Sequence, residues 1–258
     1  MDVEAKKGSK WTKEETILAF DLYCKTPFSK IGKSNRDIIM LAELIGRTPS
    51  SVGLKMANLA SFDPTLSARH VKGMSNASKL DKEVFEEFSK DWEGLSYQAE
   101  LIKSRITQKI DYVDLDIDLP NGVDRETESK QRVGQYFFRS VVLSAYGNKC
   151  CVTGLSIPEL LVASHIKPWA ISDQKTERTN PSNGLSLNAF HDKAFDKGLI
   201  TIDKNYKIIF SKRISEIEMD ENTMEWFNSY KNKQIILPEK FIPDKRFIEY
   251  HNDFIFQV

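Results

Sequence analysis

The chain has few cysteines, and none of them is spaced to hold a structural metal. Its 258 residues include only three, Cys24, Cys150 and Cys151, and they form no Cys-x-x-Cys pair. So few cysteines, in an odd number, argue against a secreted domain held together by disulfides. The absence of a Cys-x-x-Cys pair argues against a zinc knuckle. We expect a cytoplasmic protein in which the vicinal cysteines pack as small apolar groups.

The sequence also lacks long apolar runs and a net charge. No apolar stretch reaches the length of about eighteen residues that a membrane span needs, and residues 1–11 lack the apolar centre of a secretory signal. Basic and acidic residues number 37 each, which by itself does not favour a nucleic-acid partner. The charges are uneven, however, since residues 1–80 are net basic and residues 81–130 are net acidic. This asymmetry predicts separate modules.

The first sixty residues have the start and stop signals of three short helices. Residues 12–15 have the spacing of a capping box, and a second helix can run from Asn35 to Gly46. The third has the clearest start, because Thr48 is a good N-cap and Pro49 fits the first turn. Helix is also predicted over residues 78–110.

The tight turn between the second and third helices is compatible with a helix-turn-helix. In that arrangement the third helix would present polar residues to a DNA groove, and Arg47 would lie near a phosphate. The residues expected to face DNA are Ser50, Ser51, Lys55 and Asn58. The alternative is a three-helix bundle whose polar face only meets water.

Composition changes near residue 120 and predicts a two-part α+β protein. Residues 111–118 alternate acidic and apolar side chains, and the turn-rich segment that follows resembles a linker. We place a helical, DNA-recognition type of module at residues 1–120, a linker at 121–130 and a second domain at 131–258.

The second domain carries the residues suited to chemistry. An amphipathic helix over residues 132–146 is followed by two expected short strands, residues 150–153 and 160–164. His165 comes directly after the second strand, and Asn183 follows a polar loop. A short helix then carries His191. Short strands and a helix, each with one ligand-type residue, can hold a single metal against a phosphate.

This order of residues resembles the HNH endonuclease family, whose ββα-metal finger runs hairpin, His, loop, Asn, helix, His. The resemblance covers about residues 130–205. Segments similar to one bacterial branch of the family are Gln135–Arg139, Tyr146–Cys150, Ser164–Trp169 and His191–Gly198. More loosely, residues 11–64 resemble the leading region joined to such nuclease domains in some restriction-type proteins.

The resemblance implies a role for each of three residues. His165 would be the general base that takes a proton from water, and His191 would bind a divalent metal. Asn183 would tether the loop and orient the catalytic imidazole. Asn183 also precedes Gly184, and such a pair is common in ordinary turns.

The sequence departs from the commonest family pattern at two positions. Ser164 stands before the base, where the family often has Asp or His, and Phe195 replaces a second helix histidine. Asp196 can substitute, which makes His191, Asp196 and Ser164 the expected metal site. Such an oxygen-rich set suits Mg²⁺ or Mn²⁺ better than Zn²⁺.

The expected function is therefore metal-dependent cleavage of double-stranded DNA, in restriction of foreign or modified DNA. Lys167 and Arg139 are candidate phosphate contacts, although Arg139 can equally brace the finger. Cutting both strands would need a homodimer or two sequential nicks. A non-catalytic DNA-binding regulator with a degenerate finger is the alternative, favoured by Ser164 and Phe195. An RNA-directed or toxin-like nuclease would share the chemistry and differ in substrate.

Overall fold

The computed structural model describes residues 8–68, 77–108 and 125–258, which form two compact units. Unit 1 comprises the described residues up to Val141 together with Gln174–Thr179, and unit 2 comprises Val142–Asp173 and Asn180–Val258. The long helix α7 contributes to both units. No helix within these described ranges is both long and apolar enough to cross a lipid bilayer.

Unit 1 is built from helices. In chain order they are α1 (Lys13–Lys25), the 3₁₀ turn Phe28–Lys30, α2 (Arg36–Ile45), α3 (Pro49–Ala60), α4 (Pro64–Ala68), α5 (Lys79–Phe88), α6 (Trp92–Thr107) and the first part of α7 (Arg125–Ala145).

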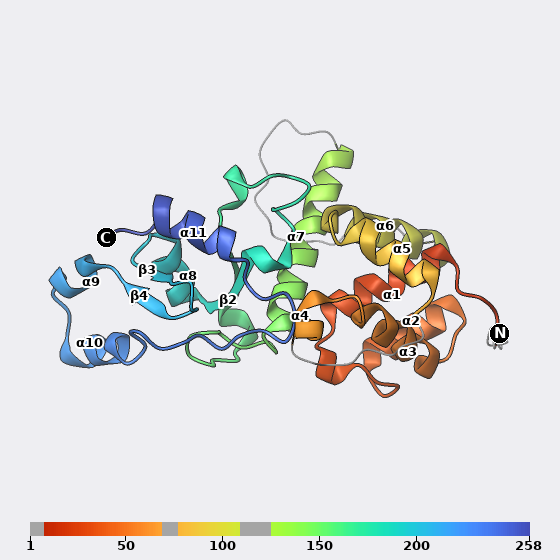
Figure 1. Cartoon of the computed structure of the whole chain (residues 1–258), viewed down its shortest axis with the longest axis horizontal. Helices are drawn as coiled ribbons and strands as arrows, with labels where there is room; N and C mark the ends of the chain where they lie inside the picture. The colour runs from red at the N-terminus through yellow and green to blue at the C-terminus, as the bar shows by residue number, and fades with distance from the viewer. Residues whose placement is uncertain (1–7, 69–76, 109–124) are drawn as a thin grey trace. The chain divides into compact units, whose positions relative to one another are not determined.

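Helix α1 is the centre of unit 1. It packs against α2, α3, α5 and α6, which lie around it in Figure 1. Ile17, Leu18, Phe20 and Tyr23 are all buried, although they do not share one side of the helix. A helix enclosed by neighbours on several sides needs no single apolar stripe, which explains why its sequence shows a broad apolar face.

The predicted helix signals of unit 1 are confirmed. Thr12 and Glu15 form a reciprocal capping box at the start of α1. Gly46 ends α2 in the left-handed conformation, and the Thr48 side chain caps α3 ahead of Pro49. The helix predicted over residues 78–110 is instead two helices, α5 and α6, because Asp91 caps a new start.

The second part of the segment expected to link the two modules, from residue 125 on, is helix. Residues 121–124, like 111–118, lie outside the described residues, and α7 already includes residues 125–130. The amphipathic helix predicted from Arg132 is therefore the second part of a longer one.

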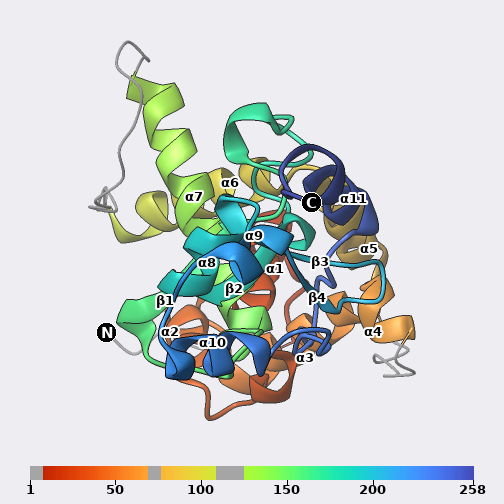
Figure 2. The same cartoon turned by 90° about the vertical axis from the view of Figure 1, so that its left-hand side faces the viewer.

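Unit 2 contains the small hairpin and helix expected from the sequence, but with one strand changed. Strand β1 (Leu161–His165) pairs antiparallel with β2 (Gly184–Asn188), and α8 (Ala189–Asp196) packs against both (Figure 2). Residues 150–153, predicted as a strand, form a turn, although Cys151 N donates to Ser186 O at 2.7 Å. The strand that pairs with β1 is therefore β2, which follows the long loop after His165, and not residues 150–153.

The rest of unit 2 lies around this hairpin and helix. A second antiparallel hairpin is formed by β3 (Ile200–Ile202) and β4 (Ile208–Phe210). The remaining helices are α9 (Lys212–Glu216), α10 (Glu221–Asn228) and α11 (Lys245–Phe254), and short 3₁₀ turns are formed by Pro158–Leu160, Trp169–Ile171 and Pro181–Asn183. The α+β class, with a helical first part and the small sheets in the second, is confirmed.

Candidate active site

His165 is the last residue of β1. It pairs with Gly184 in the antiparallel register, and its side chain is half-buried. The indole of Trp169 meets the imidazole edge-on, with ring centroids 5.6 Å apart. A histidine at a strand end, held against a ring and still partly open to solvent, is positioned to exchange a proton with a ligand.

Asn183 clamps the backbone that follows His165. Its Oδ1 accepts from Lys167 N at 2.8 Å, and its Nδ2 donates to Lys167 O at 3.0 Å. Its main-chain carbonyl accepts from Ile166 N at 2.9 Å, and the residue is fully buried. Paired hydrogen bonds to one peptide unit fix the start of the loop. The tethering role expected for Asn183 thus has a structural basis on the Ile166–Lys167 segment.

His191 is fully buried in the first part of α8. The side chain of Asn188, the N-cap of the helix, accepts from His191 N at 2.9 Å and lies 3.1 Å from His191 Nδ1. The rings of Phe190, Trp226 and Tyr230 surround the imidazole, with centroids 5.1 to 5.7 Å away. Burial lowers the pKa of His191 to about 4, so the ring is neutral near pH 7.

The tautomer of His191 follows from these contacts. Because Asn188 Oδ1 accepts hydrogen bonds, Nδ1 carries the proton and Nε2 carries the lone pair. His191 Nε2 is buried and has no hydrogen-bond partner among the described residues. The lone pair is chemically suited to a metal, but aromatic rings surround the imidazole that carries it.

Helix α8 carries two carboxylates, the half-buried Asp192 and the exposed Asp196. Asp192 and Asp196 are four residues apart, and Ser164 lies close enough to Asp192 for its hydroxyl to lower the pKa of that carboxyl. Burial outweighs this contact and raises the pKa of Asp192. Burial and the negative charge of Asp192 raise the pKa of Asp196. Ser164 directly precedes the expected base, His165, in β1.

The expected metal ligands come from two elements that pack against each other, Ser164 from β1 and both His191 and Asp196 from α8. Within the described ranges no group of three or more His, Cys, Asp or Glu side chains is placed to hold a metal ion. The metal site stays a prediction.

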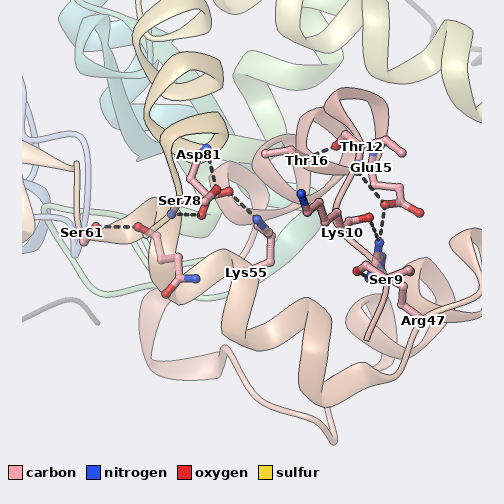
Figure 3. Close-up of polar contacts among 11 residues, drawn as sticks. Ser9, Lys10, Thr12, Glu15, Thr16, Arg47, Lys55, Ser61, Ser78 and Asp81 are labelled. Atoms are coloured by element: carbon pink, nitrogen blue, oxygen red, sulfur yellow. Dashed lines mark hydrogen bonds and ion pairs between the residues drawn. The ribbon is translucent and has the colours of Figure 1, made fainter. Parts of the chain in front are cut away.

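Two of the basic residues expected to contact DNA are buried inside unit 1. Arg47 donates to Glu15 Oε2 at 2.7 Å and to the carbonyls of Ser9 and Lys10, and Lys55 pairs with Asp81 (Figure 3). Both cations also lie over the Trp11 ring, at 4.3 Å for Arg47 Cζ and 4.8 Å for Lys55 Nζ. In this conformation neither charge is available to a DNA groove, because each forms an ion pair inside the helical bundle.

The other expected DNA contacts are more open. Ser50 and Arg139 are exposed, and Ser51, Asn58 and Lys167 are half-buried. Lys167 Nζ lies 5.3 Å from the centre of the Tyr250 ring. The roles of these five residues in DNA binding stay predictions. The three that lie on α3, Ser50, Ser51 and Asn58, are uncharged.

Sequence reasoning missed two residues of the site, Asp192 and Asn188. A signal for Asp192 was present, since a carboxylate four positions before Asp196 shares its helix face. Asn188 could have been found as the N-cap three residues before His191. Neither residue belongs to the His–Asn–His order on which the interpretation was based.

The comparison with protein families covers the hairpin and helix described above. Residues 150–203 match the family described as HNH endonuclease. This segment belongs to the HNH endonuclease family. The match includes His165, Asn183 and His191 in the order expected, together with Asp192 and Asp196.

A solved structure described as a modification dependent TagI restriction endonuclease is similar to part of the chain. The sequences are 19% identical, the match covers 44% of this chain and 35% of that one, and the TM-score is 0.27. The chain thus spans about one third of the length of that protein. A search of curated proteins finds no match.

Proposed function

We propose that the chain is a divalent-metal-dependent DNA endonuclease in which His165 is the general base. One observation carries the proposal. His165 ends β1 beside α8, its following loop is fixed by Asn183, and the whole arrangement lies inside the segment that matches the HNH endonuclease family.

The chemistry of phosphodiester hydrolysis fits these residues. An attacking water must lose a proton, and a neutral imidazole has a suitable basicity near pH 7. His165 would take that proton, while the edge contact with Trp169 and the Asn183 clamp restrict where its ring can lie. A bound divalent cation would supply charge stabilisation for the phosphate and the leaving oxygen.

The expected substrate is double-stranded DNA, and restriction of foreign or modified DNA is the proposed setting. The helical unit would select or hold the DNA, with the outer face of α3 around Ser50 and Ser51 as its contact surface. That face carries few charges, so its contacts would contribute selectivity more than affinity. Reading of a base modification by this unit is part of the proposal.

Cleavage of a supercoiled plasmid tests the proposal directly. Wild-type protein and the His165→Ala variant are incubated with Mg²⁺ or Mn²⁺ on unmodified and cytosine-methylated plasmid. We expect the wild type to nick or linearise at least one plasmid and the variant to do neither. The Asp253→Asn variant, altered at an exposed residue of α11, serves as the matched control and should cut like wild type.

The outcomes separate the proposal from its alternatives. DNA binding without cutting by any protein would favour a non-catalytic regulator, and cutting of RNA in preference to duplex DNA would favour the RNA-directed nuclease. Equal cutting by wild type and His165→Ala would contradict the role of His165. Sedimentation with and without DNA shows whether double-strand cutting goes with a homodimer.

A further inference from the structure

We propose that the helical unit 1 positions the loop of the nuclease site, and that Gly134 of α7, Glu93 of α6 and Thr179 are the positioning residues. This inference rests on the proposed function. It gives unit 1 a part in the cleavage step, in addition to the selection of DNA proposed for it.

The loop between the proposed base and Asn183 belongs to both units. His165 ends β1 in unit 2, the chain then enters unit 1 at Gln174, and it returns to unit 2 at Asn180. Thr179, the last residue of the unit 1 segment, is four positions before Asn183. The part of the loop that leads into Asn183 therefore continues directly from a segment of unit 1.

Thr179 packs closely over a glycine of α7. A Cβ placed on Gly134 would lie 3.0 Å from Thr179 Cγ2 and 3.5 Å from Glu93 Cγ. Carbon atoms in ordinary contact are about 3.5–4.0 Å apart, so a side chain at position 134 would press on Thr179 first. Thr179 is fully buried, and its hydroxyl has no hydrogen-bond partner among the described residues. The segment is therefore held at this point by packing that only a glycine permits.

Glu93 adds an electrostatic restraint at the same place. Its side chain is almost fully buried, and Lys130 Nζ of α7 lies 3.7 Å from its Oε2. Burial raises the pKa of the carboxyl, while the charges of Lys130 and Arg178 and a hydrogen bond from Gln174 oppose that rise. Arg178 and Gln174 belong to the loop segment, so the carboxylate attracts the same segment that packs over Gly134.

The turn after the segment carries the restraint to the site. The side chain of Asn180 accepts from Ser182 N at 3.0 Å, and its main-chain carbonyl accepts from Asn183 N at 2.9 Å. Asn183 in turn holds both polar backbone groups of Lys167. Because these contacts form a continuous series, a shift of the segment would reach the backbone that follows His165.

Amide hydrogen exchange of the full chain, without DNA or metal, tests this coupling. Gly134→Ala adds the carbon that would press on Thr179, and Gly53→Ala is the matched control, because a Cβ on this glycine of α3 meets nothing within 4 Å. We expect exchange at the amides of Lys167 and Asn183 to become about threefold faster or more in Gly134→Ala and to stay unchanged in Gly53→Ala. Alanine has the higher helix propensity, so faster exchange would not reflect a weaker α7.

A second background separates the close contact from a general effect of the substitution. Thr179→Ser removes the Cγ2 that the added carbon would meet and keeps the hydroxyl. We expect Gly134→Ala to change nothing further when it is added to Thr179→Ser. Unchanged exchange in Gly134→Ala alone overturns the proposal. Exchange that rises equally in both backgrounds, or equally throughout α8 and β3, overturns it as well.

Cleavage kinetics supply a readout that a purely structural role would not move. A misplacement of about 1 Å at a catalytic group can lower a rate about 10²-fold, so a shift of a few tenths of an ångström should lower it several-fold. We expect Gly134→Ala to lower kcat for plasmid cleavage about threefold or more and to leave KM within about twofold. A raised KM with unchanged kcat would assign the segment to DNA binding and overturn its positioning role.

Failure of this inference is distinguishable from failure of the proposed function. Plasmid cleavage with exchange and kcat unaffected by Gly134→Ala would keep the nuclease and reject the positioning by unit 1. Faster exchange at Lys167 in Gly134→Ala, with no cleavage by wild type, would keep the coupling between the segment and the loop and reject the nuclease.

Discussion

Two buried positive charges in unit 1 are paired, whereas two buried polar atoms around α8 in unit 2 are not. In unit 1 the buried Arg47 pairs with Glu15, and the buried Lys55 pairs with Asp81. Around α8, Ser164 Oγ and His191 Nε2 make no hydrogen bond of ordinary geometry with the described residues, and Arg47 Nε and Asn58 Oδ1 are unsatisfied in the same way in unit 1. The buried ion pairs stabilise unit 1, and unpaired polar atoms cost stability in both units.

The pKa values of buried carboxyls show the same contrast. Burial alone would raise the pKa of Asp21 in α1, but Lys25 and Lys103 lie against it and lower it. Burial raises the pKa of Asp192, and the opposing effects of Ser164 and Lys193 are smaller. Neighbouring cations therefore decide the direction of the shift at Asp21, and burial decides it at Asp192.

The largest expected effect that sharpens this comparison is the loss of cleavage in His165→Ala with the fold unchanged. Loss of a general base reduces the rate by about 10²–10⁴-fold. Because the imidazole is half-buried at a strand end, we expect the midpoint of thermal unfolding to stay within about 2 °C. A plasmid assay and a calorimetric scan on the same preparation check both. A large fall in the unfolding midpoint would assign His165 a structural role.

The next largest effect is expected from Arg47→Ala in unit 1. The change leaves the Glu15 carboxylate buried without its partner and removes the cation over Trp11. Breaking a buried ion pair in this way costs about 3–5 kcal/mol. Chemical denaturation measures the free energy of unfolding. Because Arg47 is buried, weaker DNA binding with unchanged stability would contradict its structural role and restore it as a DNA contact.

A smaller and pH-dependent effect is expected from Asp21→Asn. The folded-state pKa of Asp21 lies below the ordinary 3.8, so its ionised form stabilises the fold above pH 3.8 and loses that effect as pH falls through the folded value. Because both lysines reach solvent, we expect a cost of about 2 kcal/mol at pH 7. The difference in unfolding free energy between wild type and variant should be constant from pH 7 to pH 5 and shrink as the pH falls below 3.8. A difference that does not change with pH would point to packing instead.

The smallest effect on stability is expected from Ser164→Ala. Removing a buried hydroxyl without a good partner should leave the free energy of unfolding unchanged or raise it by up to about 1 kcal/mol. Binding of Mn²⁺ should weaken in the same variant, because the cation loses an oxygen ligand. Destabilisation beyond about 1 kcal/mol would show that the hydroxyl supports the fold and has no ligand role.

The local signals of the sequence were sufficient for much of the fold. Thr12 and Thr48 cap helix starts and Gly46 ends a helix through hydrogen bonds to residues only a few positions away. The helices therefore begin and end where these residues predict. Strand pairing was less predictable, because β1 pairs with residues more than twenty positions away while residues 150–153 form only a turn. The sequence of a short apolar run does not predict which distant segment it will pair with through backbone hydrogen bonds.

The candidate site shows the same division between local order and spatial arrangement. The sequence by itself determined the family of the segment around residues 150–203 and the order His165, Asn183, His191, because these depend only on residue type and spacing. Only the tertiary structure decided that His191 is enclosed by Trp226 and Tyr230 while Asp192 lies against Ser164. The same holds for Arg47, whose charge is buried against Glu15 and the carbonyls of Ser9 and Lys10. The physical reason is that the surroundings of a side chain are set by segments distant in sequence.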